Sequence, residues 1–123
     1  MATVAVQPSG AGVVIGNAQT GNGDTTDIAD RGFNRSGGAV VLTSTIGATP
    51  TVTCNIQGSF DGSVWFNVPY ALVATPRTFV VTAITITTAV TTHYLLQEGV
   101  PYRYLKVARS ANTNVTLTTT VYV

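Results

Sequence analysis

Apolar and polar residues alternate along much of this chain, and the alternation is strictest in residues 114–123. In that segment one parity is mainly Val and Leu, and the other consists of Asn, Thr and Tyr. Because successive side chains of a strand point to opposite faces, the pattern predicts a strand with one buried and one solvent-exposed face. No segment shows a helical period, so the sequence predicts an all-β protein.

A second alternating segment, residues 51–60, leads into a predicted hairpin. Its apolar residues, from Val52 to Phe60, share the parity that we expect to be buried, and the other parity is polar. Asp61-Gly62 supplies a tight turn, because Gly adopts positive φ without a Cβ clash. Residues 64–68 then form the returning strand.

Strand-length segments recur from residue 39 onward, separated by short turns rich in Gly, Pro, Asp and Asn. Several strands at such spacing indicate an antiparallel β-sandwich, of jelly-roll or immunoglobulin-like Greek-key topology. The predicted strands are residues 39–45, 51–60, 64–68, 77–86, 91–97, 102–109 and 114–123.

Residues 1–38 differ in composition, since they hold eight of the twelve glycines together with Asn, Asp, Ser and Gln. Such a sequence loses much conformational entropy on ordering and has few side chains to pack. We therefore expect an extended N-terminal arm, residues 1–38, followed by a β-sandwich domain, residues 39–123. Short strands are predicted within the arm, at residues 3–6, 12–15 and 27–29.

The chain carries few charges. Lys and Arg number six, Asp and Glu number five, and charged residues make up 9% of the chain, against roughly 25% in an ordinary soluble domain. Thr supplies polar surface instead, which suits a pleated sheet. A nearly neutral surface permits close packing between chains, although it also fits a soluble monomer. We expect no nucleic acid partner, because Arg103, Lys106 and Arg109 fall on both faces of a strand.

Cys54 is the only cysteine, so no disulfide can form within the chain. Its parity places it among buried apolar residues, where we expect a small hydrophobic side chain rather than a reactive thiol. The first residues lack the basic and apolar regions of a secretory signal, which predicts synthesis in the cytosol without signal-directed export. Residues 78–96 are interrupted by Thr throughout, so we expect no membrane span.

The sequence predicts no catalytic residues, no cofactor and no metal site, and hence a protein that is not an enzyme. His93 is the only histidine, and nucleophile-elbow, phosphate-binding and dinucleotide motifs are absent from the sequence. Asp24, Asp27 and Asp30 lie three apart in a Gly-rich segment that would permit calcium. Their spacing fits neither an EF-hand nor a nonapeptide calcium repeat, and Asp also favours loops by bonding backbone amides.

Trp65 is the only tryptophan, and it has two interpretations. Val64, Phe66 and Val68 share one parity, so Trp65 points to the opposite face if all four belong to one strand. We favour packing of Trp65 beneath the hairpin. The alternative is a ligand platform that Trp65 forms with nearby tyrosines.

Two motifs resemble those of small bacteriophage virion proteins. The first is Gly58-Ser59-Phe60-Asp61-Gly62-Ser63-Val64-Trp65, and the second is Tyr102-Arg103-Tyr104-Leu105-Lys106-Val107. In those proteins a Gly-Ser-x-Asp-Gly-x-x-Trp hairpin and a Tyr-x-Tyr-Val-x-Val strand recur in β-sandwich components of heads and tails. The resemblance covers residues 39–123. A similar pair of motifs occurs in discoidin-like carbohydrate-binding modules, although this chain is shorter and begins with a Gly-rich segment.

The first resemblance implies a non-enzymatic virion structural protein, specifically a capsid decoration (cement) protein that is made in the host cytoplasm and stabilises the head lattice from the capsid surface. Its partners would be the major capsid protein and further copies of itself, and residues 2–38 would make these contacts. The second resemblance implies a carbohydrate-binding module or tail adhesin, in which Trp65 and nearby tyrosines stack on a glycan. A tail-tube, neck or other assembly protein of the same kind of virion is a third alternative.

Overall fold

The computed structural model describes residues 2–6 and 12–123, and the regular elements in them are β-strands. The all-β prediction is confirmed. No helix in the described residues has the length and hydropathy needed to cross a membrane. In chain order, the strands are β1 (Ala2–Ala5), β2 (Val13–Gln19), β3 (Gly23–Asp24), β4 (Asp27–Asp30), β5 (Ala39–Ser59), β6 (Phe66–Asn67), β7 (Tyr70–Leu72), β8 (Ile84–Ile86), β9 (Thr91–Leu96) and β10 (Tyr104–Tyr122).

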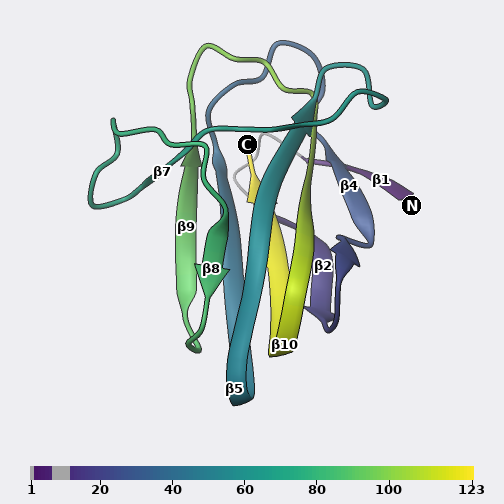
Figure 1. The fold of residues 1–123 in the computed structure, drawn as a ribbon. Coiled ribbons are helices and arrows are strands. Elements are labelled where there is room, and N and C mark those ends of the chain that lie inside the picture. The colour runs from purple at the N-terminus through teal and green to yellow at the C-terminus, as the bar shows by residue number, and fades with distance from the viewer. Residues whose placement is uncertain (1, 7–11) are drawn as a thin grey trace.

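The strands are joined in one strongly curled sheet (Figure 1). Its hydrogen-bonded order is β1-β4-β10-β5-β9-β7, with β2 and β3 also paired to β10 and with β6 and β8 also paired to β5. The pair β1 and β4 runs parallel, whereas the other pairs in the described residues are antiparallel. The sheet is therefore mixed, in contrast to the antiparallel prediction, because the long connection through β2 and β3 returns the chain beside β1 in the same direction.

The two longest strands, β5 and β10, both fold back near their middle. They pair with each other from the first residue of β5 to its last, and the register shifts lie where β10 bends. Thr49, Ala111 and Asn114 have positive φ at these bends. Figure 1 shows each strand descending to the lower end of the molecule and rising again. The predicted turns at residues 47–50 and 110–113 are thus bends inside two long strands.

Buried apolar side chains from both halves of β5 and β10 belong to one core cluster. The predicted parity of residues 52–56 is confirmed, because Val52 and Cys54 are fully buried and Ile56 is 2% exposed. Phe60 is an exception at 54% exposed, since the chain leaves the ladder after Ser59. The core cluster contains Val6, Ile15, Ala29, Val40, Leu42, Val52, Cys54, Ile56, Val68, Tyr70, Ile84, Ile86, Tyr94, Leu96, Tyr102, Leu105, Val107, Val115, Leu117 and Val121.

Residues 13–30 are part of this sheet, whereas the sequence predicts an extended arm there. The strand β2 pairs with the second half of β10, and β3 and β4 pair with its first half. Ile15 and Ala29 are buried in the core. The predicted short strands are present, and pairing with β10 supplies the backbone partners that offset the entropy of ordering a Gly-rich segment. Residues 1 and 7–11 of the predicted arm lie outside the described residues.

Arg109 of β10 holds the connection between β2 and β3 in place. Its guanidinium donates hydrogen bonds to the carbonyl oxygens of Thr20, Gly21 and Asp24 at 3.1, 3.0 and 3.2 Å. Arg109 is buried, whereas Lys106 lies on the outer face of the same strand. The prediction that the basic residues of this segment fall on both faces is confirmed.

The predicted strand at residues 77–86 is wrong for most of its length, because only Ile84–Ile86 belongs to a strand. Residues 73–83, which we call the β7–β8 loop, lead away from the sheet and return (Figure 1). Within the loop, Val80 forms an isolated antiparallel bridge with Tyr70. That bridge turns the chain back on itself, so residues 73–79 cannot join the ladder of β5.

The burial of Cys54 predicts an unreactive thiol. Burial raises the pKa of this thiol from 9.0 to about 11, which lowers its thiolate fraction about a hundredfold at neutral pH. We expect the folded protein to react with a disulfide reagent such as dithionitrobenzoate at least a hundredfold more slowly than the protein unfolded in urea. Equal reaction rates in the two states would contradict this placement of Cys54.

Candidate functional site

The turn after β5 is fixed by two side chains. The Asp61 carboxylate accepts hydrogen bonds from the backbone N–H groups of Ser63 and Val64 at 2.8 and 3.0 Å. Ser59 Oγ accepts one from the N–H of Gly62 at 2.8 Å, and Gly62 has a φ of 83°. The Val64 and Ser63 amides hold the pKa of the Asp61 carboxyl below its usual range. The predicted Asp61-Gly62 turn is confirmed, and its own hydrogen bonds make it rigid.

After this turn, the Trp65 side chain lies on the outer face of the sheet. The Lys106 ammonium lies 4.5 Å from the centre of the Trp65 ring, a cation–π distance. Trp65 belongs neither to the buried core cluster nor to the partly buried residues packed on it. The favoured prediction, packing beneath the hairpin, is therefore wrong, because Phe66 occupies the space over the core. The Phe66 ring packs against Phe60 and Tyr102 at centroid distances of 5.6 and 5.5 Å.

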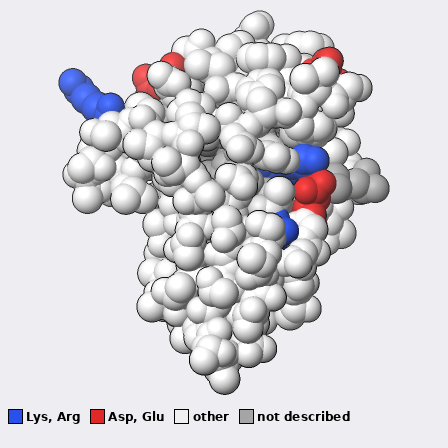
Figure 2. Space-filling model, in the orientation of Figure 1, with Lys and Arg blue, Asp and Glu red and all other residues white. Residues whose placement is uncertain are grey.

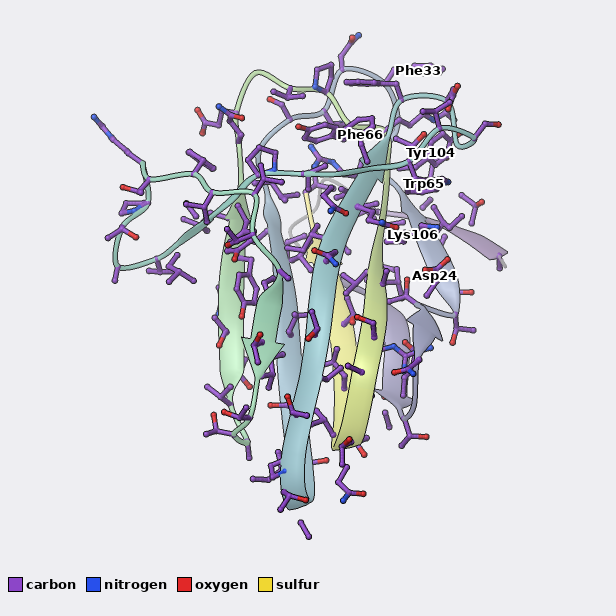
Figure 3. The ribbon with its side chains drawn as sticks, in the orientation of Figure 1. Asp24, Phe33, Trp65, Phe66, Tyr104 and Lys106 are labelled. Carbon is purple, nitrogen blue, oxygen red and sulfur yellow. The ribbon has the colours of Figure 1, made fainter. Side chains whose placement is uncertain are left out.

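Arg103 forms a second stack beside the first. Its guanidinium carbon lies 4.2 Å from the ring centre of Phe33 and 5.0 Å from that of Tyr104. The Phe33 side chain is 76% exposed, so one face of this stack is open to solvent. Figure 3 shows the two stacks following one another along the outer side of β10. We call this surface the aromatic–cation column; its members are Phe33, Arg103, Tyr104, Trp65, Lys106 and Asp24.

Two ion pairs neutralise the cations of the column. Arg103 donates two hydrogen bonds to the Asp30 carboxylate, at 3.0 and 3.2 Å, and Lys106 lies 2.9 Å from an Asp24 oxygen. The Arg103 guanidinium lowers the pKa of the Asp30 carboxyl, and Asp30 raises the pKa of Arg103. Figure 2 shows acidic and basic atoms side by side on the right flank of the molecule, with other charged atoms near the upper end.

A neutral aromatic surface of this kind suits ligands that combine apolar faces with hydrogen-bonding groups. Gln57, which is opposite Lys106 in the ladder, donates a hydrogen bond to Asn67 at 3.2 Å. This amide pair places further donors and acceptors on the strand next to the column. Such a combination of rings and amides can contact either another protein or a carbohydrate.

The candidate catalytic and metal-binding residues are not brought together. His93 is exposed on β9, where its register partner is Val41. Asp24 and Asp30 each bind a different cation of the column, so the Gly-rich acidic segment is used for ion pairing. In the described ranges, no group of three His, Cys, Asp or Glu side chains could hold a metal ion.

Two surface hollows lie away from the column. One, of about 500 Å³, lies between the β7–β8 loop and the end of β9, and includes Phe79 and Leu95 in its lining. The other, of about 470 Å³, lies at the bends of β5 and β10, and is lined mainly by Thr, Gly and Asn. Neither hollow combines acidic, basic and nucleophilic groups in the pattern of a catalytic centre.

Sequence reasoning missed Phe33 and the stacking role of Arg103. Phe33 lies in a Gly-rich polar segment that supplies no strand pattern, so its parity carries no information. A large aromatic side chain in such a segment has no local apolar surface to pack on, and this indicates that it contacts a distant part of the chain or a ligand.

The ion pair between Asp30 and Arg103 predicts a pH-dependent difference. We expect Asp30→Asn to lower the midpoint of thermal unfolding at pH 7 by about 2–4 °C, because the charged partner of Arg103 is lost. The folded-state pKa of Asp30 is lowered from 3.8, so its contribution is complete well above pH 3.8 and is lost as the pH falls through the folded value. The two midpoints, measured by calorimetry, should therefore converge as the pH is lowered below 3.8. A gap that stays constant from pH 7 to pH 2 would show that the ion pair is not its cause.

Comparisons with protein-family models, with curated proteins and with solved structures give no match. The function of this chain is accordingly inferred from its own residues and their geometry.

Proposed function

We propose that this chain is a non-enzymatic structural protein of a bacteriophage virion, specifically a capsid decoration (cement) protein. It is synthesised in the host cytoplasm and sits on the capsid surface, where it contacts the major capsid protein lattice and further copies of itself. The motif pair around Trp65 and Tyr104 supports the proposal through its resemblance to virion β-sandwich proteins.

The observation that carries the proposal is the amount of apolar surface that this small fold leaves uncovered. Seven of the large exposed apolar side chains lie in or next to three loops: Phe33 in residues 31–38, Phe60 and Val64 in residues 60–65, and Leu72, Val73, Val80 and Val81 at the β7–β8 loop. Exposed apolar side chains that lie together, as at the β7–β8 loop, mark surfaces that contact other proteins. The most exposed of them are Phe33 at 76%, Val64 at 65% and Val73 at 63%.

The charge pattern also suits a lattice protein. The described ion pairs join β10 to β3 and Arg103, just before β10, to β4, and the formal net charge of +1 gives little repulsion between neighbouring chains. The strand β1 is an edge strand of the sheet, next to β4. Its other edge can therefore pair with a strand of a neighbouring chain. On this proposal, the predicted contacts of residues 2–38 include edge contacts made by β1.

The curled sheet also supports a more specific fold assignment. Both halves of β5 and of β10 contribute buried side chains to one core cluster, which supports such an assignment. We propose that this arrangement is a variant of the two-layered β-sandwich, in which the layers stay joined at the bends. Jelly-roll and immunoglobulin-like Greek-key arrangements are the two candidates for its topology.

Electron microscopy tests the virion proposal. Gold-labelled antibodies raised against the purified protein are applied to phage particles isolated from the same biological source as the protein. Regular labelling over the heads is expected from a decoration protein, because it occupies many equivalent lattice sites. Labelling confined to the tail or neck would favour a tail-tube, neck or other assembly protein. Particles without any label would contradict the whole proposal.

Carbohydrate binding is a second candidate function, and the position of Trp65 favours it. The partly buried Trp65 ring stacks with Lys106 on the outer face, and Gln57, the ladder partner of Lys106, bonds Asn67, so this face carries a ring and amide groups of the kind that sugar-binding surfaces use. A carbohydrate-binding module or tail adhesin would use this surface to bind a glycan.

An array of bacterial surface glycans tests the second candidate. We expect Trp65→Ala to reduce binding at least tenfold while its circular dichroism stays unchanged, because Trp65 lies outside the core. Tyr122→Ala is the matched control, since Tyr122 is a 38% exposed aromatic residue that is not part of the column. Full binding by Trp65→Ala, or no binding by the wild-type protein, would eliminate this candidate.

A further inference from the structure

The β7–β8 loop is an ordered projection. Tyr70 and Val80 exchange two backbone hydrogen bonds of 3.0 Å, which close the base of the loop. Two successive turns follow, in which Thr75 N–H donates to the carbonyl of Leu72 and Thr78 N–H donates to the carbonyl of Thr75. Tyr70 also packs edge-on against Tyr94 at 5.3 Å, so the base of the loop is anchored in the core.

This ordered loop presents apolar side chains to solvent. Val73 is 63% exposed and Val81 is 56% exposed, and Leu72 and Val80 are also exposed. The hydrogen bonds at the base prevent the loop from folding down to bury them. The loop's own hydrogen bonds keep these apolar side chains exposed, and such a surface favours contact with another molecule.

The groove beside the loop carries one charge of each sign. It has a volume of about 500 Å³ and an apolar lining that includes Pro76, Phe79 and Leu95. Arg77 lines it from the loop, and Glu98 lines it from the segment after β9. Neither side chain forms an ion pair within the described residues. Figure 2 shows a basic side chain standing clear of the surface on the side where the loop lies.

We propose that the β7–β8 loop and its groove form an interface between two copies of this chain, with Arg77 of one copy paired to Glu98 of the other. In an interface with two-fold symmetry the same patch meets itself, so a residue pair is made twice. A patch with apolar groups, one cation and one anion is complementary to itself, because each charge faces its opposite in the partner. A second copy of the chain can therefore pair both charges, without a different protein.

This inference deepens the proposed function, since it names the surface through which copies of the protein would join. The two proposals fail separately. Labelled phage heads together with a monomeric protein in solution would overturn the interface alone, whereas self-association without virion labelling would overturn the virion proposal alone.

Charge exchange between copies tests the interface. The full chain is examined by sedimentation equilibrium at low salt, where we expect the wild-type protein to self-associate. Arg77→Glu and Glu98→Arg should each raise the dissociation constant at least tenfold, because like charges then face each other. An equimolar mixture of the two variants should recover the wild-type dissociation constant. In the mixed pair, the introduced acid of one variant meets the introduced base of the other, and the unchanged Glu98 and Arg77 also meet.

The mixing experiment separates contacts between copies from contacts within one chain. Recovery by the double variant but not by the mixture would show that Arg77 and Glu98 act within one chain, and would overturn the proposal. A wild-type protein that remains monomeric at about 100 μM would also overturn it.

Matched substitutions control for general effects of charge. Arg35→Glu is the charge control, because Arg35 is exposed and does not line the groove. Val14→Asp, on β2, is the control for Val81→Asp, since both side chains are about half exposed. We expect Val81→Asp to weaken association at least tenfold and Val14→Asp to leave it unchanged. Equal weakening by both members of either pair would contradict the assigned surface.

Discussion

The pairing of β5 with β10 is the constraint on which the rest of this structure depends. The two strands are paired on both sides of the bend and the register shifts lie at the bend itself, so both strands fold back at the same level. Thr49 in β5 and Ala111 and Asn114 in β10 take up left-handed backbone conformations at that level. This shared bend brings the first half of β5 to the same core as its second half. The core, the outer face and the position of the loops all follow from it.

The few charges of the chain are concentrated where the N-terminal strands meet β10. Lys106 pairs with Asp24, Arg109 binds three carbonyl oxygens between β2 and β3, and Arg103, next to β10, pairs with Asp30 at the end of β4. These contacts join a Gly-rich segment with little apolar surface to a strand that is already ordered. Arg31 contrasts with them, since its buried guanidinium has no hydrogen-bond partner among the described residues and burial lowers its pKa. Ion pairing therefore substitutes for hydrophobic burial along this edge of the sheet.

Sequence reasoning predicted the features that depend on local alternation. Neighbouring residues alone were enough to predict which side chains are buried in two segments, Val52 to Ile56 and Val115 to Val121. They were also enough to predict the Asp61-Gly62 turn. The features that it missed depend on distant partners. The Gly-rich strands exist because β10 pairs with them, residues 73–83 leave the sheet because Tyr70 binds Val80, and Trp65 lies outside because Phe66 takes the inner position. The aromatic–cation column joins residues from four separate segments, which no local pattern can reveal.

The sequence separation of the central strands has a consequence for how this protein is made. Residues 39–59 find their partners in residues 104–122, so the chain between them must be closed into a large loop before the ladder can form. Closing such a loop costs entropy before any contact compensates for it, and folds dominated by distant pairing form slowly. During translation β5 emerges long before β10 and has no partner on that side. The two halves of the core are therefore completed only when the last strand has been synthesised.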